Sequence, residues 1–132
     1  MSIFVVKYNR MSFEVSNTIL IERIQQSKIG EVDFDNLPFG KIRTDHMLIC
    51  EYSDGKWSQP RVVPYQDISL DPSAKIFHYG QSIFEGMKAY KDEEGRIWLF
   101  RPLENQKRLN ISAKRLAMPE LPEAYFMEGL ST

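Results

Sequence analysis

Residues 87–118 read MKAYKDEEGRIWLFRPLENQKRLNISAKRLAM, and this stretch decides the fold class. Two apolar-rich runs, 87–91 and 96–100, flank the turn-forming sequence Asp92-Glu93-Glu94-Gly95. Apolar runs on either side of a short polar segment that ends in glycine are typical of a β-hairpin. The stretch therefore predicts two antiparallel strands.

A helix is expected directly after this hairpin. Pro102 suits the first helical turn, and Pro119 cannot continue a helix, so the helix should run from Pro102 to about Met118. Apolar residues at helical spacing predict its buried stripe, namely Leu109, Ala113, Leu116 and Ala117. Basic residues surround that stripe, namely Lys107, Arg108, Lys114 and Arg115.

A second hairpin is predicted upstream. Residues 46–52 and 56–65 flank Ser53-Asp54-Gly55, and an Asp-Gly pair suits the positive φ angles that tight hairpin turns require. Pro60 and Pro64 lack a backbone N–H, so they should confine the return strand to a sheet edge or a break.

The remaining segments complete an α+β expectation. Residues 18–25 are rich in β-branched side chains and predict a strand, whereas 27–39 should be irregular. A short helix is expected over 120–131, and residues 1–15 look like a leader before a single domain, 16–132. The fold class is therefore α+β, a mostly antiparallel sheet covered by helices.

Composition excludes several functional classes. The 132 residues carry a net charge of −1, so no basic surface for nucleic acid is expected. The single cysteine cannot form an internal disulfide framework or a multi-cysteine metal site. No apolar run approaches the length of a membrane span or a signal peptide, so a cytoplasmic protein is expected.

Few residues offer chemistry by themselves. His46 and His78 share no metal-ligand spacing, and each is interpreted as a hydrogen-bonded structural histidine. Cys50 lies in an apolar pattern and is interpreted as a small buried residue, not a nucleophile. Neither a metal site nor a phosphate-binding loop is indicated.

Two features remain open on the residues alone. Tyr79 and Phe84 lie in a glycine-containing stretch and could line an apolar pocket or belong to the core. Arg108 could lie on an ordinary solvated helix face or bind an anion, because a guanidinium matches phosphate with parallel hydrogen bonds.

Four separated blocks resemble one enzyme family. They read FGKIRTDHM (39–47), QPRVVPY (59–65), HYGQSIFEGMKAY (78–90) and LFRP (99–102). In order and spacing they resemble the opening of branched-chain-amino-acid aminotransferases over roughly residues 37–120. Arg43 departs from the pattern, because the family usually has an aromatic residue before Thr-Asp-His-Met.

The resemblance implies the small N-terminal domain of a fold-type-IV enzyme that uses pyridoxal 5'-phosphate. Such enzymes transfer the amino group of leucine, isoleucine or valine to 2-oxoglutarate. The cofactor lies between the small domain and a larger C-terminal catalytic domain, which this chain lacks. The family also implies a homo-oligomer, usually a dimer or an assembly of dimers.

Individual roles carry over from the same resemblance. Arg108 matches the arginine that binds the cofactor phosphate, while Phe39, Tyr79 and Phe84 match the walls of the substrate side-chain pocket. The tyrosine equivalent reaches into the neighbouring subunit's active site. None of the nine lysines, Lys88 included, matches the Schiff-base lysine. No catalytic residue is therefore assigned, and the chain alone should be inactive.

Other functions remain possible at this stage. The chain could be a natural non-catalytic binding or dimerisation module that uses the same residues for assembly. D-amino-acid transaminase and aminodeoxychorismate lyase share the fold, but the matches around Thr44–Met47 and Phe84–Met87 favour the branched-chain subfamily.

Overall fold

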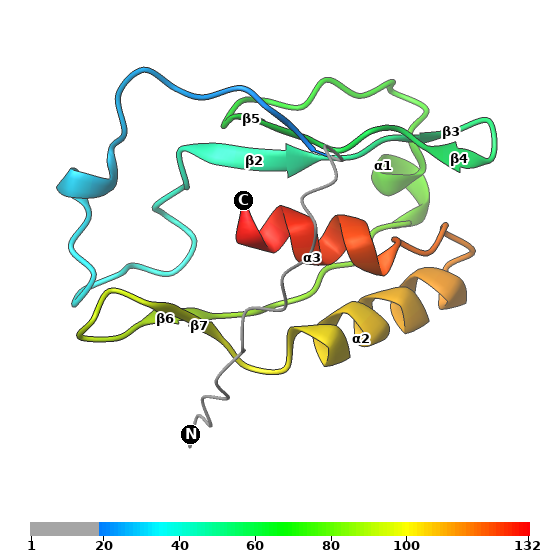
Figure 1. The fold of residues 1–132 in the computed structure, drawn as a ribbon. Coiled ribbons are helices and arrows are strands. Elements are labelled where there is room, and N and C mark those ends of the chain that lie inside the picture. Colours follow the sequence, from blue (N-terminus) through cyan, green and yellow to red (C-terminus); the bar gives the residue numbers. More distant parts are fainter. Residues whose placement is uncertain (1–18) are drawn as a thin grey trace. The chain divides into compact units, whose positions relative to one another are not determined.

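The computed structural model describes residues 19–132, which form two compact units (Figure 1). Among these residues, one unit contains 19–70 with 128–132, and the other contains 71–127. The leader expected over residues 1–15 lies outside the described part of the chain.

The first unit contains a three-stranded sheet in the order β1-β5-β2. β1 (Leu20–Ile21) runs parallel to β5 (Arg61–Pro64), and β2 (His46–Ile49) runs antiparallel to β5, with Met47 opposite Val63. Val63 is 6% exposed and is a core residue of this unit.

The predicted return strand is broken at residues 58–60, which confirms one of the two expected effects of the prolines, whereas β5 lies at the centre of its sheet, so the edge alternative is wrong. Pro60 lies just before β5 and Pro64 is its last residue, so neither proline removes an N–H from the middle of the ladder. Pro60 is fully buried, and its carbonyl accepts a hydrogen bond from the N–H of Leu20 (3.0 Å).

β1 is shorter than the strand expected over residues 18–25. The N–H of Ile24 donates to Nε2 of His46 (3.2 Å) instead of to a strand. The following segment is largely irregular, as predicted, apart from the short 3-10 helix η1 (Ile29–Glu31). Asp45 anchors this segment by accepting hydrogen bonds from Ser27 Oγ and from the N–H of Lys28.

The predicted turn at Asp54-Gly55 is confirmed. β3 (Tyr52–Ser53) and β4 (Lys56–Trp57) pair antiparallel around it. Asp54 and Gly55 have φ angles of 52° and 79°, the left-handed geometry of a two-residue hairpin turn.

The second unit begins with the short helix α1 (Lys75–Tyr79), which Gly80 terminates with a φ of 58°. Residues 81–88 then run on to the hairpin of β6 (Ala89–Lys91) and β7 (Ile97–Leu99). This hairpin is confirmed, with shorter strands than expected.

Residues 81–88 alternate in exposure although they form no strand ladder. The half-buried side chains are Gln81, Ile83, Glu85 and Met87. The exposed residues are Ser82, Phe84, Gly86 and Lys88. Alternation with period two is the mark of an extended backbone, and it sends Phe84 and Glu85 to opposite sides.

Asp92 organises the turn of the second hairpin. Its carboxylate accepts hydrogen bonds from Nε of Arg96 and Nε1 of Trp98, each at 2.7 Å. Burial opposes ionisation of Asp92, but these donors outweigh it and lower its pKa to about 2. The turn is thus fixed by side-chain contacts as well as by Gly95, whose φ is 80°.

Helix α2 (Pro102–Arg115) starts where expected and ends earlier than Met118. Ala117 has a φ of 52°, a left-handed conformation that an α-helix cannot contain. Arg101, the residue before the helix, also has a positive φ of 46°.

The buried face of α2 differs from the predicted stripe. Ala113 is buried as expected, but Leu116 is 40% exposed and Ala117 is exposed as well. Gln106 is buried instead, and its Nε2 donates to the carbonyl of Leu121 (3.0 Å). This hydrogen bond satisfies a polar side chain that helical spacing alone would have excluded from the core.

The predicted C-terminal helix is confirmed as α3 (Glu123–Ser131), which starts three residues later than expected. Asn110 of α2 bonds both backbone groups of Leu121, accepting its N–H and donating to its carbonyl (2.9 and 3.0 Å). The α+β expectation therefore holds, with one parallel strand pair among the antiparallel ones.

Candidate anion-binding site

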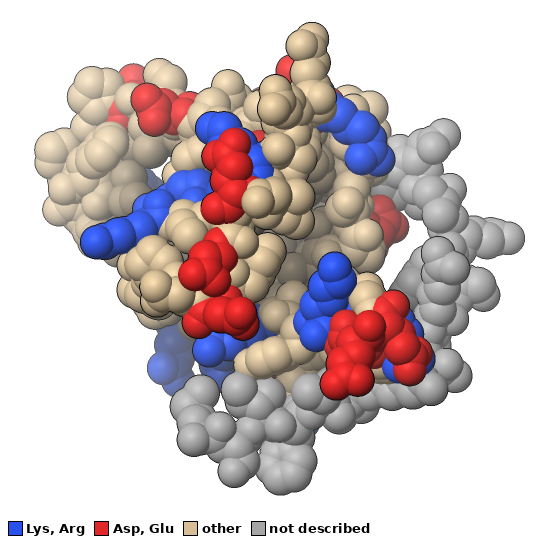
Figure 2. Space-filling view, turned by 90° about the vertical axis from the view of Figure 1, so that its left-hand side faces the viewer, with Lys and Arg blue, Asp and Glu red and all other residues tan. Residues whose placement is uncertain are grey.

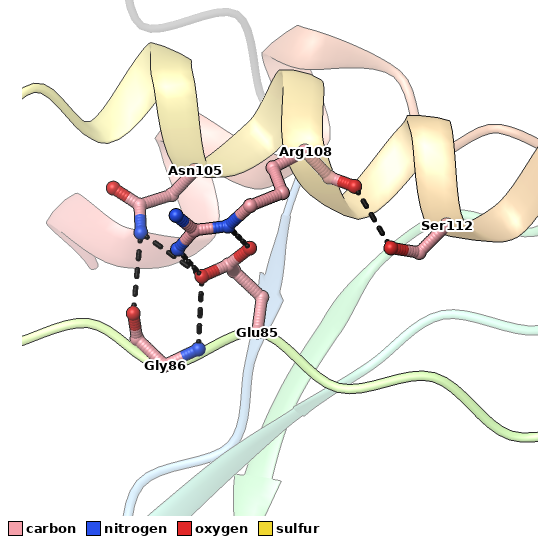
Figure 3. A network of polar contacts seen from close by, with 5 residues as sticks. All are labelled: Glu85, Gly86, Asn105, Arg108 and Ser112. Carbon is pink, nitrogen blue, oxygen red and sulfur yellow. Dashed lines mark hydrogen bonds and ion pairs between the residues drawn. The ribbon is translucent and has the colours of Figure 1, made fainter.

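A polar network joins the extended segment 81–88 to helix α2 (Figure 3). Arg108 of α2 donates through Nε to Oε2 of Glu85 (2.7 Å) and through Nη2 to Oε1 of the same carboxylate. The side chain of Glu85 is only 9% exposed, whereas that of Arg108 is 66% exposed. The carboxylate is thus the sheltered partner, and the guanidinium extends from it toward solvent.

Asn105 and Gly86 hold the carboxylate of Glu85 from other directions. Nδ2 of Asn105 donates to Oε1 of Glu85 (3.1 Å) and to the carbonyl of Gly86 (3.2 Å). The N–H of Gly86 also donates to Oε1 (3.0 Å). Asn105 can reach these atoms because it lies three residues before Arg108, on the same side of the helix.

These contacts determine the protonation states. The hydrogen bond from Arg108 lowers the pKa of Glu85 to about 2, with smaller contributions from Asn105 and Gly86. In return, the carboxylate raises the pKa of Arg108 above its already high value. Both groups are therefore fully charged at neutral pH.

Arg108 keeps unused donors despite this ion pair. Among residues 19–132, no group hydrogen-bonds to its Nη1. The guanidinium also lines an open hollow of about 330 Å³ with Phe100, Arg101, Glu104 and Asn105. Two cationic side chains and an amide beside this hollow are groups that bind anions, and the carboxylate of Glu104 lines it as well.

Charged side chains of both signs line this hollow. Figure 2 shows basic and acidic side chains interspersed on the face that it displays, without a field of one sign. Glu104 itself pairs with Lys107 (3.0 Å) and with Arg101 (3.8 Å). Glu104 thus offsets part of the positive charge that Arg101 brings to the hollow.

The three predicted pocket-wall aromatics are all exposed. Tyr79 and Phe84, in the same unit as Arg108, are 83% and 91% exposed, so the interpretation of them as core residues is wrong. Neither lines the hollow at Arg108. Phe39 is 104% exposed and belongs to the other unit.

The structural interpretation of the histidines and the cysteine is supported. His46 accepts from Ile24, as described above, and Nε2 of His78 lies 2.9 Å from the carbonyl of Pro72. Cys50 is half-buried and donates to the carbonyl of Ser58 (3.3 Å), and burial raises the pKa of its thiol. A thiol with a raised pKa is a poor nucleophile at neutral pH.

The described residues contain neither a cluster of metal-ligating side chains nor a membrane-spanning helix. Over 19–132, no group of three or more His, Cys, Asp or Glu side chains is placed to hold a metal ion. The same residues contain no helix that is long and apolar enough to cross a membrane.

Glu85 and Asn105 are the site residues that sequence reasoning missed. Glu85 lies inside a quoted motif, and a charged residue at an inward position of an alternating apolar stretch is the signal that could have identified it. Asn105 could have been found only from its helical spacing to Arg108.

Comparison with known proteins decides the family question. The chain is 45% identical over 114 residues to branched-chain-amino-acid aminotransferase 2 of Bacillus subtilis (strain 168), covering 86% of this chain. It is 54% identical over 96 residues, 72% of this chain, to the branched-chain-amino-acid aminotransferase of Mycolicibacterium smegmatis. The chain is a relative of the branched-chain-amino-acid aminotransferases. The enzyme of that name in Helicobacter pylori (strain J99) is also 44% identical over 101 residues.

The chain spans less than a third of these aminotransferases. The matches cover 31%, 26% and 30% of the three relatives. No protein-family model matches the chain. The resemblance found in four sequence blocks is therefore confirmed at the level of sequence, over a part of an aminotransferase.

Proposed function

We propose that residues 16–132 are the small N-terminal domain of a fold-type-IV branched-chain-amino-acid aminotransferase. The whole protein would transfer the amino group of leucine, isoleucine or valine to 2-oxoglutarate, in the cytoplasm and as a homo-oligomer. The observation that carries this proposal is the identity of 44–54% to aminotransferases, which extends over most of the chain.

In this proposal Arg108 binds the phosphate of pyridoxal 5'-phosphate. Its unused N–H donors beside the hollow fit a phosphate oxygen, and Arg101 supplies a second positive charge there. The bound cofactor supplies a reactive aldehyde and an electron-accepting ring, which is the demanding part of amino-group transfer. The role of this chain is to fix the phosphate end, so that the ring is held in place.

The exposed aromatics serve the substrate side chain. A branched aliphatic side chain carries no polar group, so it must be recognised by a fitted apolar surface, worth about 1–3 kcal/mol per methylene. Phe39, Tyr79 and Phe84 present such surface, and the C-terminal domain and a second subunit would cover it.

The covalent step needs a lysine that lies outside these residues. Lys88 lies within a matched block, but the resemblance does not align it with the Schiff-base lysine of the family. We therefore assign this chain binding and orientation, and we assign it no proton transfer.

An amino-transfer assay tests the proposal. The parent protein, meaning the product of the whole reading frame that contains residues 1–132, should form glutamate from leucine and 2-oxoglutarate with pyridoxal 5'-phosphate. The 132-residue chain alone should form none under the same conditions. Glutamate formation by the isolated chain, or a parent protein that accepts D-amino acids and not leucine, would overturn it.

A further inference from the structure

We propose that Glu85 is a positioning residue that sets which edge of the Arg108 guanidinium meets a phosphate. The inference rests on the proposed function, because it assumes that Arg108 binds the cofactor phosphate. It adds that the direction of this contact is decided inside the chain, by a carboxylate on the neighbouring extended segment.

The direction of the free donors follows from the shape of the guanidinium. The group is planar and carries five N–H donors in a rigid fork. Glu85 accepts hydrogen bonds from Nε–H and from one N–H of Nη2. These two donors form the side edge of the fork. The remaining donors lie along the edge formed by Nη1 and the outer N–H of Nη2. Because the group is rigid, holding the side edge fixes the direction of the free edge.

The carboxylate of Glu85 is itself held by further contacts. Glu85 is 9% exposed, and its Oε1 also accepts from Asn105 and from the N–H of Gly86. An arginine side chain loses rotamer entropy when it is fixed. Here much of that loss occurs on folding, so binding of an anion would not incur it again.

Charge acts in the opposite direction. The carboxylate of Glu85 is negative at neutral pH, and it should repel a phosphate bound beside Arg108. Positioning therefore predicts weaker phosphate binding when the carboxylate is neutralised, whereas a purely electrostatic role predicts tighter binding. Whether phosphate affinity falls or rises therefore distinguishes a positioning role of Glu85 from a purely electrostatic one.

The experiment compares pyridoxal 5'-phosphate with pyridoxal, which lacks the phosphate, in the parent protein. The readout is the ratio of their two dissociation constants, measured by titration without substrate. We expect Glu85→Gln to reduce the preference for the phosphorylated form about three- to tenfold. Glu94→Gln is the matched control, because Glu94 also pairs with an arginine, Arg96, but does not line the hollow, and it should not reduce the preference.

The outcomes distinguish this inference from the proposed function. An unchanged or increased preference in Glu85→Gln would overturn the positioning role. If Arg108→Met leaves the preference unchanged, the proposed phosphate contact itself fails. Asn105→Ala removes one of the hydrogen bonds that hold Glu85, together with the bond to the Gly86 carbonyl, and should give a smaller reduction of the same sign, which keeps the test usable if Glu85→Gln does not fold.

A second readout reports the contact directly. In ligand-free protein, the Arg108 Nε–H should give a slowly exchanging NMR signal, because it donates to a sheltered carboxylate. Glu85→Gln should speed its exchange, while Glu94→Gln should not. A signal that is unaffected by Glu85→Gln would contradict the fork described here.

Discussion

Phe84 and Glu85 are neighbours in sequence and have opposite environments. Glu85 is 9% exposed and accepts four hydrogen bonds, two from Arg108 and one each from Asn105 and Gly86. Phe84 is 91% exposed. The contacts of Glu85 lie within residues 71–127, whereas the ring of Phe84 is left exposed. Under the proposed function, phosphate recognition would be organised within this unit, and recognition of the substrate side chain would depend on further surfaces.

The largest effect should come from removing Arg108. Arg108→Met in the parent protein should weaken binding of pyridoxal 5'-phosphate about 10- to 100-fold and leave pyridoxal nearly unaffected, because a charged hydrogen-bond donor to phosphate is lost. Titration of both compounds measures it. Arg115→Met is the control, since Arg115 is exposed on the same helix. Equal losses of cofactor affinity in Arg108→Met and Arg115→Met would contradict a specific phosphate contact at Arg108.

Substitutions of Glu85 and of Phe84 should also differ in their effect on the stability of the chain. Glu85→Ala leaves sheltered donors without their acceptor, so we expect a loss of about 1–3 kcal/mol in the free energy of unfolding. Phe84→Ala should change it by less than about 0.5 kcal/mol, because the ring is exposed. Urea unfolding of the 132-residue chain provides the measurement. A larger loss in the free energy of unfolding for Phe84→Ala than for Glu85→Ala would contradict this prediction.

Phe84 should matter for substrate instead. In the parent protein, Phe84→Ala should lower kcat/KM for leucine about three- to tenfold, since part of an apolar wall is lost. The affinity for pyridoxal 5'-phosphate should stay the same. Ser82→Ala, at the neighbouring outward position of the same segment, is the control. An equal loss for alanine as amino donor would argue against a side-chain pocket.

The smallest predicted effect is a loss of stability at low pH, caused by protonation of Glu85. Its pKa is about 2 in the folded chain and near 4.5 ordinarily, so the unfolded chain takes up the proton first as the pH falls. The contribution of Glu85 is complete above pH 4.5 and is lost as the pH falls toward 2. The stability difference between wild type and Glu85→Ala should therefore be constant from pH 5 to 7 and smaller at pH 3. A difference that does not change at pH 3 would contradict the ion pair.

The sequence predicted those features that depend on local chemistry. The turn at Asp54-Gly55 and the start of α2 at Pro102 follow from backbone preferences of single residues. The early end of α2 does not, because Ala117 adopts a left-handed conformation that its residue type disfavours.

The features that were missed depend on distant contacts. Gln106 is buried because it bonds Leu121, which lies 15 residues away. Glu85 meets Arg108 across 23 residues. The central position of β5 likewise depends on β1, a segment 41 residues upstream, as Leu20 pairs with Arg61. Composition and periodicity reflect only the neighbours of a residue in sequence, so they do not predict pairings between distant segments.

The alternation of residues 81–88 limits how this segment can change in length. Substitutions keep each side chain on its own side, so an aromatic at position 84 can vary while Glu85 still reaches Arg108. Losing or gaining a single residue between Gln81 and Glu85 would turn the carboxylate outward and an apolar side chain toward helix α2. Relatives that bind phosphate through the same pair should therefore vary here in residue type and keep an unchanged number of residues.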